Sequence, residues 1–124
     1  MPLGWRASRN APSCYLSWKS GVPTETETCN TIADGLATPT PEAANVKAIR
    51  ELVDEVVLVS EEEMLRAIEF LLMKEHVVAE PAGAAATAAL LQRKGSNREI
   101  TVALVTGANV QREILQRSLQ LNSI

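Results

Sequence analysis

Aromatic residues, cysteine and histidine are scarce in this chain of 124 residues. Aromatic side chains make up 3% of the sequence, and there are two cysteines and one histidine. Aliphatic side chains and alanine must therefore fill any core, and the apolar fraction of 46% is sufficient for one. So few cysteines and histidines argue against a Cys/His metal site and favour a reduced, cytoplasmic protein.

Long apolar runs and an excess of positive charge are also missing. No apolar run approaches the roughly 18 residues that a membrane-spanning helix needs. The formal net charge is -3, and acidic and basic residues are interspersed. The sequence offers neither a basic patch nor an aromatic platform for bases, so we expect no nucleic acid and no membrane as a partner.

Residues 77–109 have the pattern of one β-α-β unit. An apolar run at 77–79 leads to Glu80, a helix of small residues follows over 82–91, and a second apolar run occupies 100–105. Strands joined through a helix should be parallel, and strands apolar on both faces are typical of a covered sheet. Glu80 and Thr106 should then meet at the carboxyl edge of the sheet, where ligands bind in open α/β folds.

The remaining periodicity predicts a helical turn at 14–18, helices over 42–53 and 111–121, and a strand at 56–59. A further helix should open at Ser60 and bury Met64, Ile68 and Leu71. The acidic residues 61–63 are more typical of a solvated helix start than of metal ligands. The predicted fold class is α/β, a partial three-layer parallel sheet of three strands with helices on both faces.

Residues 1–13 show neither a helical nor a strand period, and Pro2 and Pro12 interrupt them. We expect a divergent or disordered N-terminal segment over 1–13 and a folded part over 14–124. Three strands buried on both faces need neighbours at both edges, and the first third offers no obvious strand. The sequence therefore predicts either a segment of a larger sheet or a chain that associates with itself as a homo-oligomer.

Three short blocks resemble the threonine/serine dehydratases (ammonia-lyases), pyridoxal-phosphate (PLP) enzymes of the tryptophan synthase β-like superfamily. The blocks are Thr-Ile-Ala-Asp-Gly at 31–35, Glu-Pro-Ala-Gly-Ala at 80–84 and Thr-Gly-Ala-Asn-Val at 106–110. Their order and spacing are similar to those of the family, and the likeness runs from about residue 14 to 117. The resemblance implies the C-terminal portion of a PLP-dependent lyase domain, acting on an amino-acid substrate.

The resemblance also implies roles for three residues toward PLP. The backbone near Gly35 is expected to lie against the cofactor, and Glu80 is expected near its pyridine ring. The hydroxyl of Thr106 is expected to hydrogen-bond the pyridine nitrogen. A neutral hydroxyl does not hold a proton on that nitrogen as a carboxylate would, which favours loss of the substrate's β-hydroxyl over transamination.

Two parts of the family's machinery have no counterpart in this sequence. The Schiff-base lysine of the family lies in an earlier Ser-x-Lys-x-Arg-Gly-like motif, a context that none of Lys19, Lys47, Lys74 and Lys94 shares. The glycine-rich phosphate loop is missing as well. The chain therefore carries no catalytic or metal-binding residue of the family, and we expect weak or no PLP binding by it alone.

Three interpretations remain open at this point. The first is the C-terminal portion of an ammonia-lyase that converts threonine to 2-oxobutanoate and ammonia. The second is a non-catalytic α/β binding or interaction module, and the third is a truncated gene product. Glu80 and Thr106 could also have purely structural roles. Glu80 suits the end of a strand, and Thr106 suits a cap of the last helix. Threonine and serine, or lyase and racemase, are not distinguished.

Overall fold

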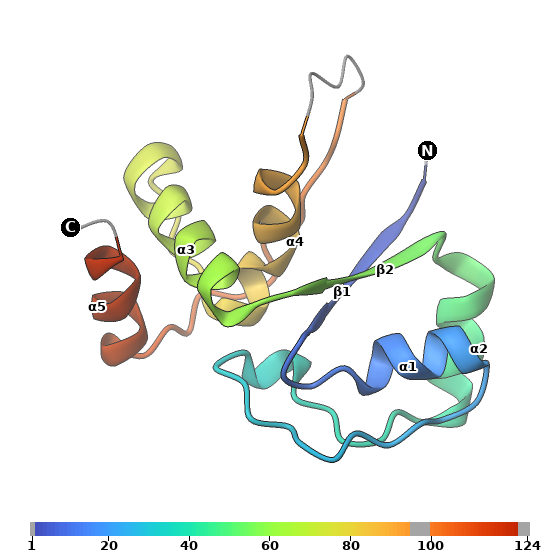
Figure 1. Ribbon diagram of the computed structural model, residues 1–124. Coiled ribbons are helices and arrows are strands. Elements are labelled where there is room, and N and C mark those ends of the chain that lie inside the picture. The colour runs from blue at the N-terminus through green and yellow to red at the C-terminus, as the bar shows by residue number, and fades with distance from the viewer. Residues whose placement is uncertain (1, 95–99, 122–124) are drawn as a thin grey trace. The chain divides into compact units, whose positions relative to one another are not determined.

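A computed structural model of the chain describes residues 2–94 and 100–121 and forms two compact units (Figure 1). The units are Met1–Glu61 and Glu62–Ile124. The elements of the first are β1 (Gly4–Ser8), α1 (Ser13–Ser20), the 3-10 helix η1 (Asp34–Leu36), α2 (Ala43–Leu52) and β2 (Glu55–Val59). Helix α3 (Glu61–Glu75) then leads to α4 (Pro81–Leu91) and α5 (Arg112–Gln120).

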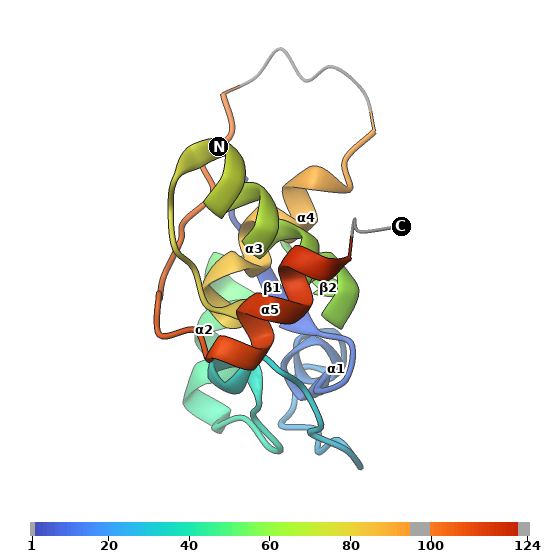
Figure 2. The ribbon, with the colours of Figure 1, turned by 90° about the vertical axis from the view of Figure 1, so that its left-hand side faces the viewer.

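The N-terminal unit is built on one parallel pair of strands. β1 pairs with β2 from Gly4 opposite Glu55 to Ser8 opposite Val59, and both strands are labelled in Figures 1 and 2. The connection passes through α1, η1 and α2, as a parallel crossover requires. Helix α1 contacts both α2 and β2. Their shared core consists of Ala7, Val53 and Val56, with Cys14, Tyr15, Trp18, Ile49 and Leu58 packed against it.

Strand β1 was not predicted, and the expectation that the first third lacks a strand is wrong. Its burial follows no apolar alternation, because Trp5 is 46% exposed while the inward residues are Ala7 and the polar Ser8. The strand is instead held by its ladder and by Asp54. The Leu3 amide donates to Asp54 Oδ2 at 2.6 Å, and the Asp54 amide donates to the Leu3 carbonyl at 2.9 Å. These are long-range contacts that no local pattern announces.

The predicted helices are confirmed, with small differences at their ends. Helix α3 buries the expected stripe of Met64, Ile68 and Leu71 and ends at Glu75, after which His76 has a φ of 56°. Helix α4 buries most of its small side chains, so close packing of alanine takes the place of large side chains. Within residues 2–94 and 100–121, no helix combines the length and the apolarity needed to cross a bilayer.

Two predicted strands, at 77–79 and 100–105, are absent from the described residues. A strand needs a neighbour for its ladder, and one backbone bond, from the Glu80 amide to the Gly107 carbonyl at 2.9 Å, lies where these runs end. Apolar side chains of the second run are exposed, with Ile100 at 88% and Leu104 at 69%. The α/β class with parallel strands is thus confirmed, but the described residues form a sheet of two strands and not of the three predicted.

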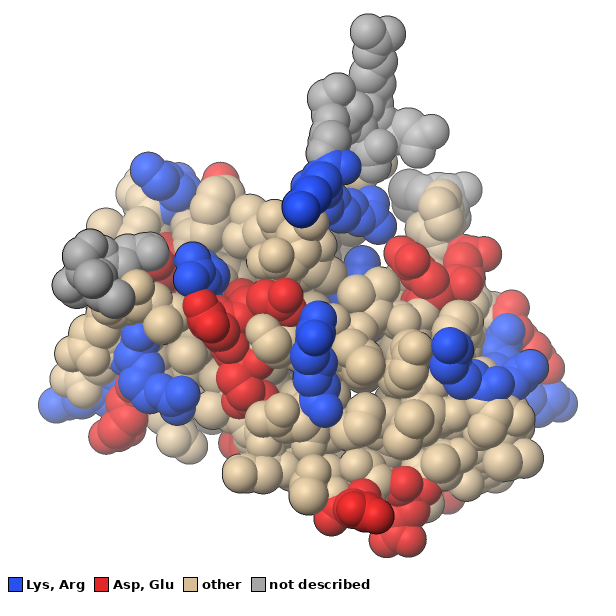
Figure 3. Space-filling view, viewed as in Figure 1, with Lys and Arg blue, Asp and Glu red and all other residues tan. Residues whose placement is uncertain are grey.

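Charged side chains of both signs lie on the face of the molecule drawn in Figure 3. On the face drawn in Figure 3, Lys and Arg side chains alternate with Asp and Glu side chains and with uncharged residues. Ion pairs of the i,i+4 type occur on α2, between Lys47 and Glu51, and on α3, between Glu62 and Arg66. These are solvent-exposed pairs, each contributing at most about 1 kcal/mol to stability.

The first turn of α4 packs closely on the backbone of Gly107. A Cβ atom built on Gly83 would lie 2.5 Å from the carbonyl oxygen of Gly107 and 2.7 Å from its nitrogen. Backbone atoms cannot move aside as a flexible side chain does, so position 83 needs glycine. This contact fixes the start of α4 against the third motif block.

Replacing Gly83 with alanine is therefore expected to destabilise the chain. In an open helix this change stabilises by about 0.5–1 kcal/mol, whereas overpacking costs about 1–3 kcal/mol. We expect the second effect to dominate and to lower the melting temperature measured by circular dichroism. A melting temperature above that of the unmodified chain would contradict the packing described.

Candidate functional site

The carboxylate of Glu80 lies against the third motif block. Glu80 is the N-cap of α4 by its backbone but makes no side-chain cap bond. Its Oε2 atom instead accepts a hydrogen bond from the Asn109 amide at 3.0 Å, and its own amide donates to the Gly107 carbonyl at 2.9 Å. The role of a polar residue at a strand end is therefore wrong, because residues 77–79, which lead to Glu80, form no strand. Two hydrogen bonds join the second and third blocks.

Gly107 allows the carboxylate this close approach. A Cβ atom at position 107 would lie 2.5 Å from Glu80 Oε1 and 2.6 Å from Glu80 Cδ. Any side chain would push the carboxylate away from the backbone that it contacts. The glycine is thus explained by contact with Glu80 and not by an unusual backbone angle.

Thr106 precedes this glycine and is exposed. Within the described part of the chain, its hydroxyl makes no hydrogen bond. The purely structural role of Thr106 as a cap of the last helix is wrong, because the N-cap of α5 is Gln111. The hydroxyl can therefore donate and accept a hydrogen bond toward a ligand.

Gly35 lies in η1 and is exposed. It belongs to the N-terminal unit, whereas Glu80 and Thr106 belong to the second unit. The structure thus brings together Glu80 and the 106–109 segment among the predicted site residues, and it places Gly35 in a separate compact unit. Sequence reasoning expected the first contact at a sheet edge, and the structure makes it through a carboxylate and two glycines.

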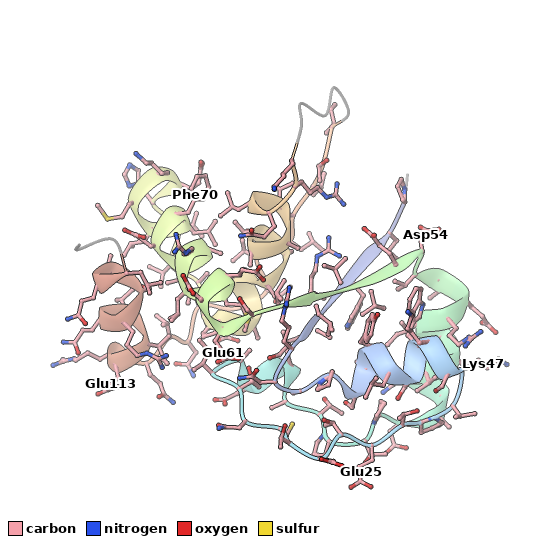
Figure 4. All side chains as sticks on the ribbon, viewed as in Figure 1. Glu25, Lys47, Asp54, Glu61, Phe70 and Glu113 are labelled. Carbon is pink, nitrogen blue, oxygen red and sulfur yellow. The ribbon has the colours of Figure 1, made fainter. Side chains whose placement is uncertain are left out.

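A second carboxylate holds the first motif block, and sequence reasoning missed it. Glu61, labelled in Figure 4 at the start of α3, accepts hydrogen bonds from Thr31 Oγ1 at 2.6 Å and from the Ile32 amide at 2.8 Å. The Oγ atom of Ser8 lies 2.9 Å from Thr31 Oγ1 and 3.3 Å from Glu61 Oε1. The solvated helix start predicted for residues 61–63 describes Glu62, which pairs with Arg66 at 2.6 Å, but is wrong for Glu61. The available signal was its position just after a buried strand.

The other chemistry-bearing side chains are dispersed. All four lysines are exposed, with Lys47 3.9 Å from Glu51 and Lys19 over the ring of Tyr15. Burial raises the pKa of the Cys14 thiol, which fits a structural rather than a reactive cysteine. Over residues 2–94 and 100–121, no group of three His, Cys, Asp or Glu side chains is placed to hold a metal ion.

Known proteins share both the sequence and the fold of this chain. The L-threonine ammonia-lyase of Geobacter sulfurreducens is 41% identical over 101 residues, which are 81% of this chain and 25% of the relative. The catabolic L-threonine dehydratase TdcB of Escherichia coli is 39% identical over 107 residues, which are 83% of this chain and 32% of the relative. The processed form of threonine deaminase isoform 2 from Solanum lycopersicum superposes with a TM-score of 0.84 at 25% identity, covering all of this chain and 37% of that one.

These matches fix how much of a relative the chain represents. It spans about a quarter to a third of the length of the curated relatives, 25% in one case and 32% in another. The profile of the family described as "Pyridoxal-phosphate dependent enzyme" matches residues 4–107, so the likeness begins in β1 and not at residue 14. Over that range the chain belongs to the pyridoxal-phosphate-dependent enzyme family.

Proposed function

We propose that this chain is the C-terminal portion of a PLP-dependent threonine or serine ammonia-lyase. The complete enzyme would convert threonine to 2-oxobutanoate and ammonia. The activities named for the relatives support this substrate class. The observation that carries the proposal is the contact of Glu80 with Gly107 and Asn109, because it joins two of the three motif blocks in one place.

We assign three residues to the cofactor. The Thr106 hydroxyl would bind the pyridine nitrogen, Glu80 would lie near the ring, and the backbone at Gly35 would lie against the cofactor. Two observations support these roles: Thr106 is exposed and its hydroxyl makes no hydrogen bond within the described part of the chain, and Gly35 is exposed. When bound, PLP supplies an electron sink for negative charge at the substrate Cα.

Thr106 would weaken the electron sink of PLP, and Glu80 would keep its position near the ring. Thr106 is neutral, so its hydroxyl would not hold a proton on the ring nitrogen as a carboxylate would, which would favour loss of the substrate's β-hydroxyl over transamination. The Glu80 carboxylate is already fixed by the Asn109 amide, so it needs little reorganisation when a ligand binds.

We propose that the chain is inactive by itself. The four lysines are exposed and lie outside any motif that resembles the family's, so none is suited to bind the cofactor covalently or to take the substrate's α-proton. The glycine-rich phosphate loop is likewise missing from the sequence. Cytoplasmic residence is part of the same proposal, and the free thiols of Cys14 and Cys29 support it.

A second candidate function is a non-catalytic α/β interaction module, with a truncated gene product as the limiting case. The observation that favours it is the lack of a lysine suited to the cofactor. The DNA upstream of Met1 separates these readings. An overlapping or frame-shifted reading frame that encodes the lysine motif and the glycine-rich loop would favour a lyase portion or a truncated product over an independent module.

The exposed apolar run at 100–105 favours association. Ile100, Val102 and Leu104 are 88%, 66% and 69% exposed, an arrangement that invites pairing with another chain. We therefore propose that the isolated chain associates with itself unless the rest of an ammonia-lyase covers this run.

The isolated chain should show no ammonia-lyase activity. With PLP and threonine we expect 2-oxobutanoate to form no faster than with free PLP, and no borohydride-trapped adduct confined to one lysine, because the four exposed lysines can react with PLP only at random. The assay measures keto acid and the mass of the reduced protein. Turnover above the free-cofactor rate would contradict the proposal.

The apolar run should control oligomeric state. We expect the triple variant Ile100→Lys, Val102→Lys, Leu104→Lys to reduce the association of the unmodified chain, measured by size-exclusion chromatography with light scattering. Leu52→Lys is the matched control, since Leu52 is 69% exposed and lies on α2. A cooperatively melting monomer for the unmodified chain would show that the chain needs no partner.

Thr106 should act through its hydroxyl. In a protein that joins this chain to the preceding part of the Geobacter relative, Thr106→Ser should keep most activity. Thr106→Val should leave the ring nitrogen without a partner, costing about 1–3 kcal/mol or about tenfold to a hundredfold in activity. Cofactor absorbance, turnover and melting temperature are measured together. Equal turnover of the Ser and Val variants would remove Thr106 from the cofactor site.

A further inference from the structure

We propose that Glu61 is a positioning residue that holds the segment 32–35 in the form that meets the cofactor. This inference rests on the proposed function, because it takes Gly35 to contact PLP. It concerns a residue outside the three motif blocks. Glu61 acts on Gly35 through Thr31 and the backbone, without touching the cofactor itself.

The first support is the number and direction of the bonds that converge on one carboxylate. Oε1 of Glu61 accepts from the Thr31 hydroxyl at 2.6 Å, and Oε2 accepts from the Ile32 amide at 2.8 Å. Both oxygens thus bind consecutive residues of the same motif block. Bonds to an ionised acceptor are among the stronger hydrogen bonds in proteins.

The second support is the set of hydrogen bonds that links Thr31 to η1. The Thr31 hydroxyl donates to Glu61 and accepts from the Ala33 amide at 3.1 Å. Ala33 is 0% exposed, and its carbonyl accepts the Leu36 amide at 2.8 Å, which closes the 3-10 turn around Gly35. A continuous series of hydrogen bonds therefore runs from Glu61 to the turn that contains Gly35.

The third support is the position of the anchors in the sheet. Ser8 ends β1, and Glu61 comes just after β2, so both lie at the carboxyl end of the parallel pair. Ser8 is 0% exposed, and its hydroxyl lies 2.9 Å from Thr31 Oγ1. The carboxyl edge of a parallel sheet is where α/β folds bind ligands. The motif block is thus tied to the ligand-binding edge of the observed sheet.

Other roles for Glu61 fit the contacts less well. A solvated helix start would leave its carboxylate in water, as at Glu62, whose side chain is 62% exposed and pairs with Arg66. A metal site would need further ligands, and the described residues contain no such cluster. Instead, both carboxylate oxygens of Glu61 accept hydrogen bonds from one loop, one from the Thr31 hydroxyl and one from the Ile32 amide.

The test compares Glu61→Gln with Glu62→Gln, which removes the same charge one residue later on the same helix. In the full 124-residue chain, an amide side chain can accept at one atom only. We expect hydrogen exchange of the Ile32 and Ala33 amides to quicken about tenfold in Glu61→Gln and to stay unchanged in Glu62→Gln. Thr31→Val should quicken exchange of the Ala33 amide, whose acceptor it removes, and Thr31→Ser should keep that exchange slow. Unchanged exchange in Glu61→Gln would overturn the inference.

A second readout separates positioning from mere stability. In the protein joined to the preceding part of the Geobacter relative, Glu61→Gln and Thr31→Val should weaken PLP binding about tenfold, with Thr31→Ser and Glu62→Gln near the unmodified value. Faster exchange with unchanged PLP affinity would overturn the inference and leave the proposed function standing. No PLP binding by the unmodified joined protein, with the Geobacter enzyme binding normally, would overturn the proposed function and the inference with it.

Discussion

The need to satisfy backbone hydrogen bonds governs this structure. Where two strands can pair, as β1 and β2 do over five residues each, a parallel sheet forms and organises the N-terminal unit. Where the described chain offers no neighbour, the apolar runs at 77–79 and 100–105 form no strand. The run at 100–105 keeps apolar side chains exposed, which is unfavourable in water.

In the motif loops, two glutamate side chains accept hydrogen bonds from backbone amides. Glu61 accepts the Ile32 amide in the first block, and Glu80 accepts the Asn109 amide in the third. Each carboxylate thus satisfies a backbone donor in a loop and fixes that loop without a regular ladder. Gly107 supports the second case because its lack of a side chain admits the Glu80 carboxylate. Motif segments with few internal bonds are in this way given defined positions.

The helices were predictable from the sequence because their signal is local. A periodic stripe such as Met64, Ile68 and Leu71, or a run of small residues after Pro81, specifies a helix wherever the segment lies. Strands behave differently, because a strand exists only with its neighbour. Strand β1 was missed since Ala7 and Ser8 carry no apolar alternation, and 100–105 was predicted since its side chains are apolar.

The contacts of the candidate site were also predictable only in part from the sequence. The meeting of Glu80 with the 106–109 segment was expected, though at the edge of strands at 77–79 and 100–105 that the described residues do not form. The role of Glu61 toward Thr31 was not, because the two lie far apart in sequence and an acidic helix start has a simpler local explanation. Long-range hydrogen bonds of this kind leave no periodic trace in a sequence.

Complementation in trans tests the central claim most directly. The full chain would be mixed with the part of the Geobacter L-threonine ammonia-lyase that precedes the region matched by this chain, and 2-oxobutanoate formation from threonine would be measured with PLP present. We expect activity that requires both polypeptides and that falls with Thr106→Val in this chain. If the two polypeptides form a stable complex that binds PLP but yields no keto acid, the chain is not a working portion of an ammonia-lyase.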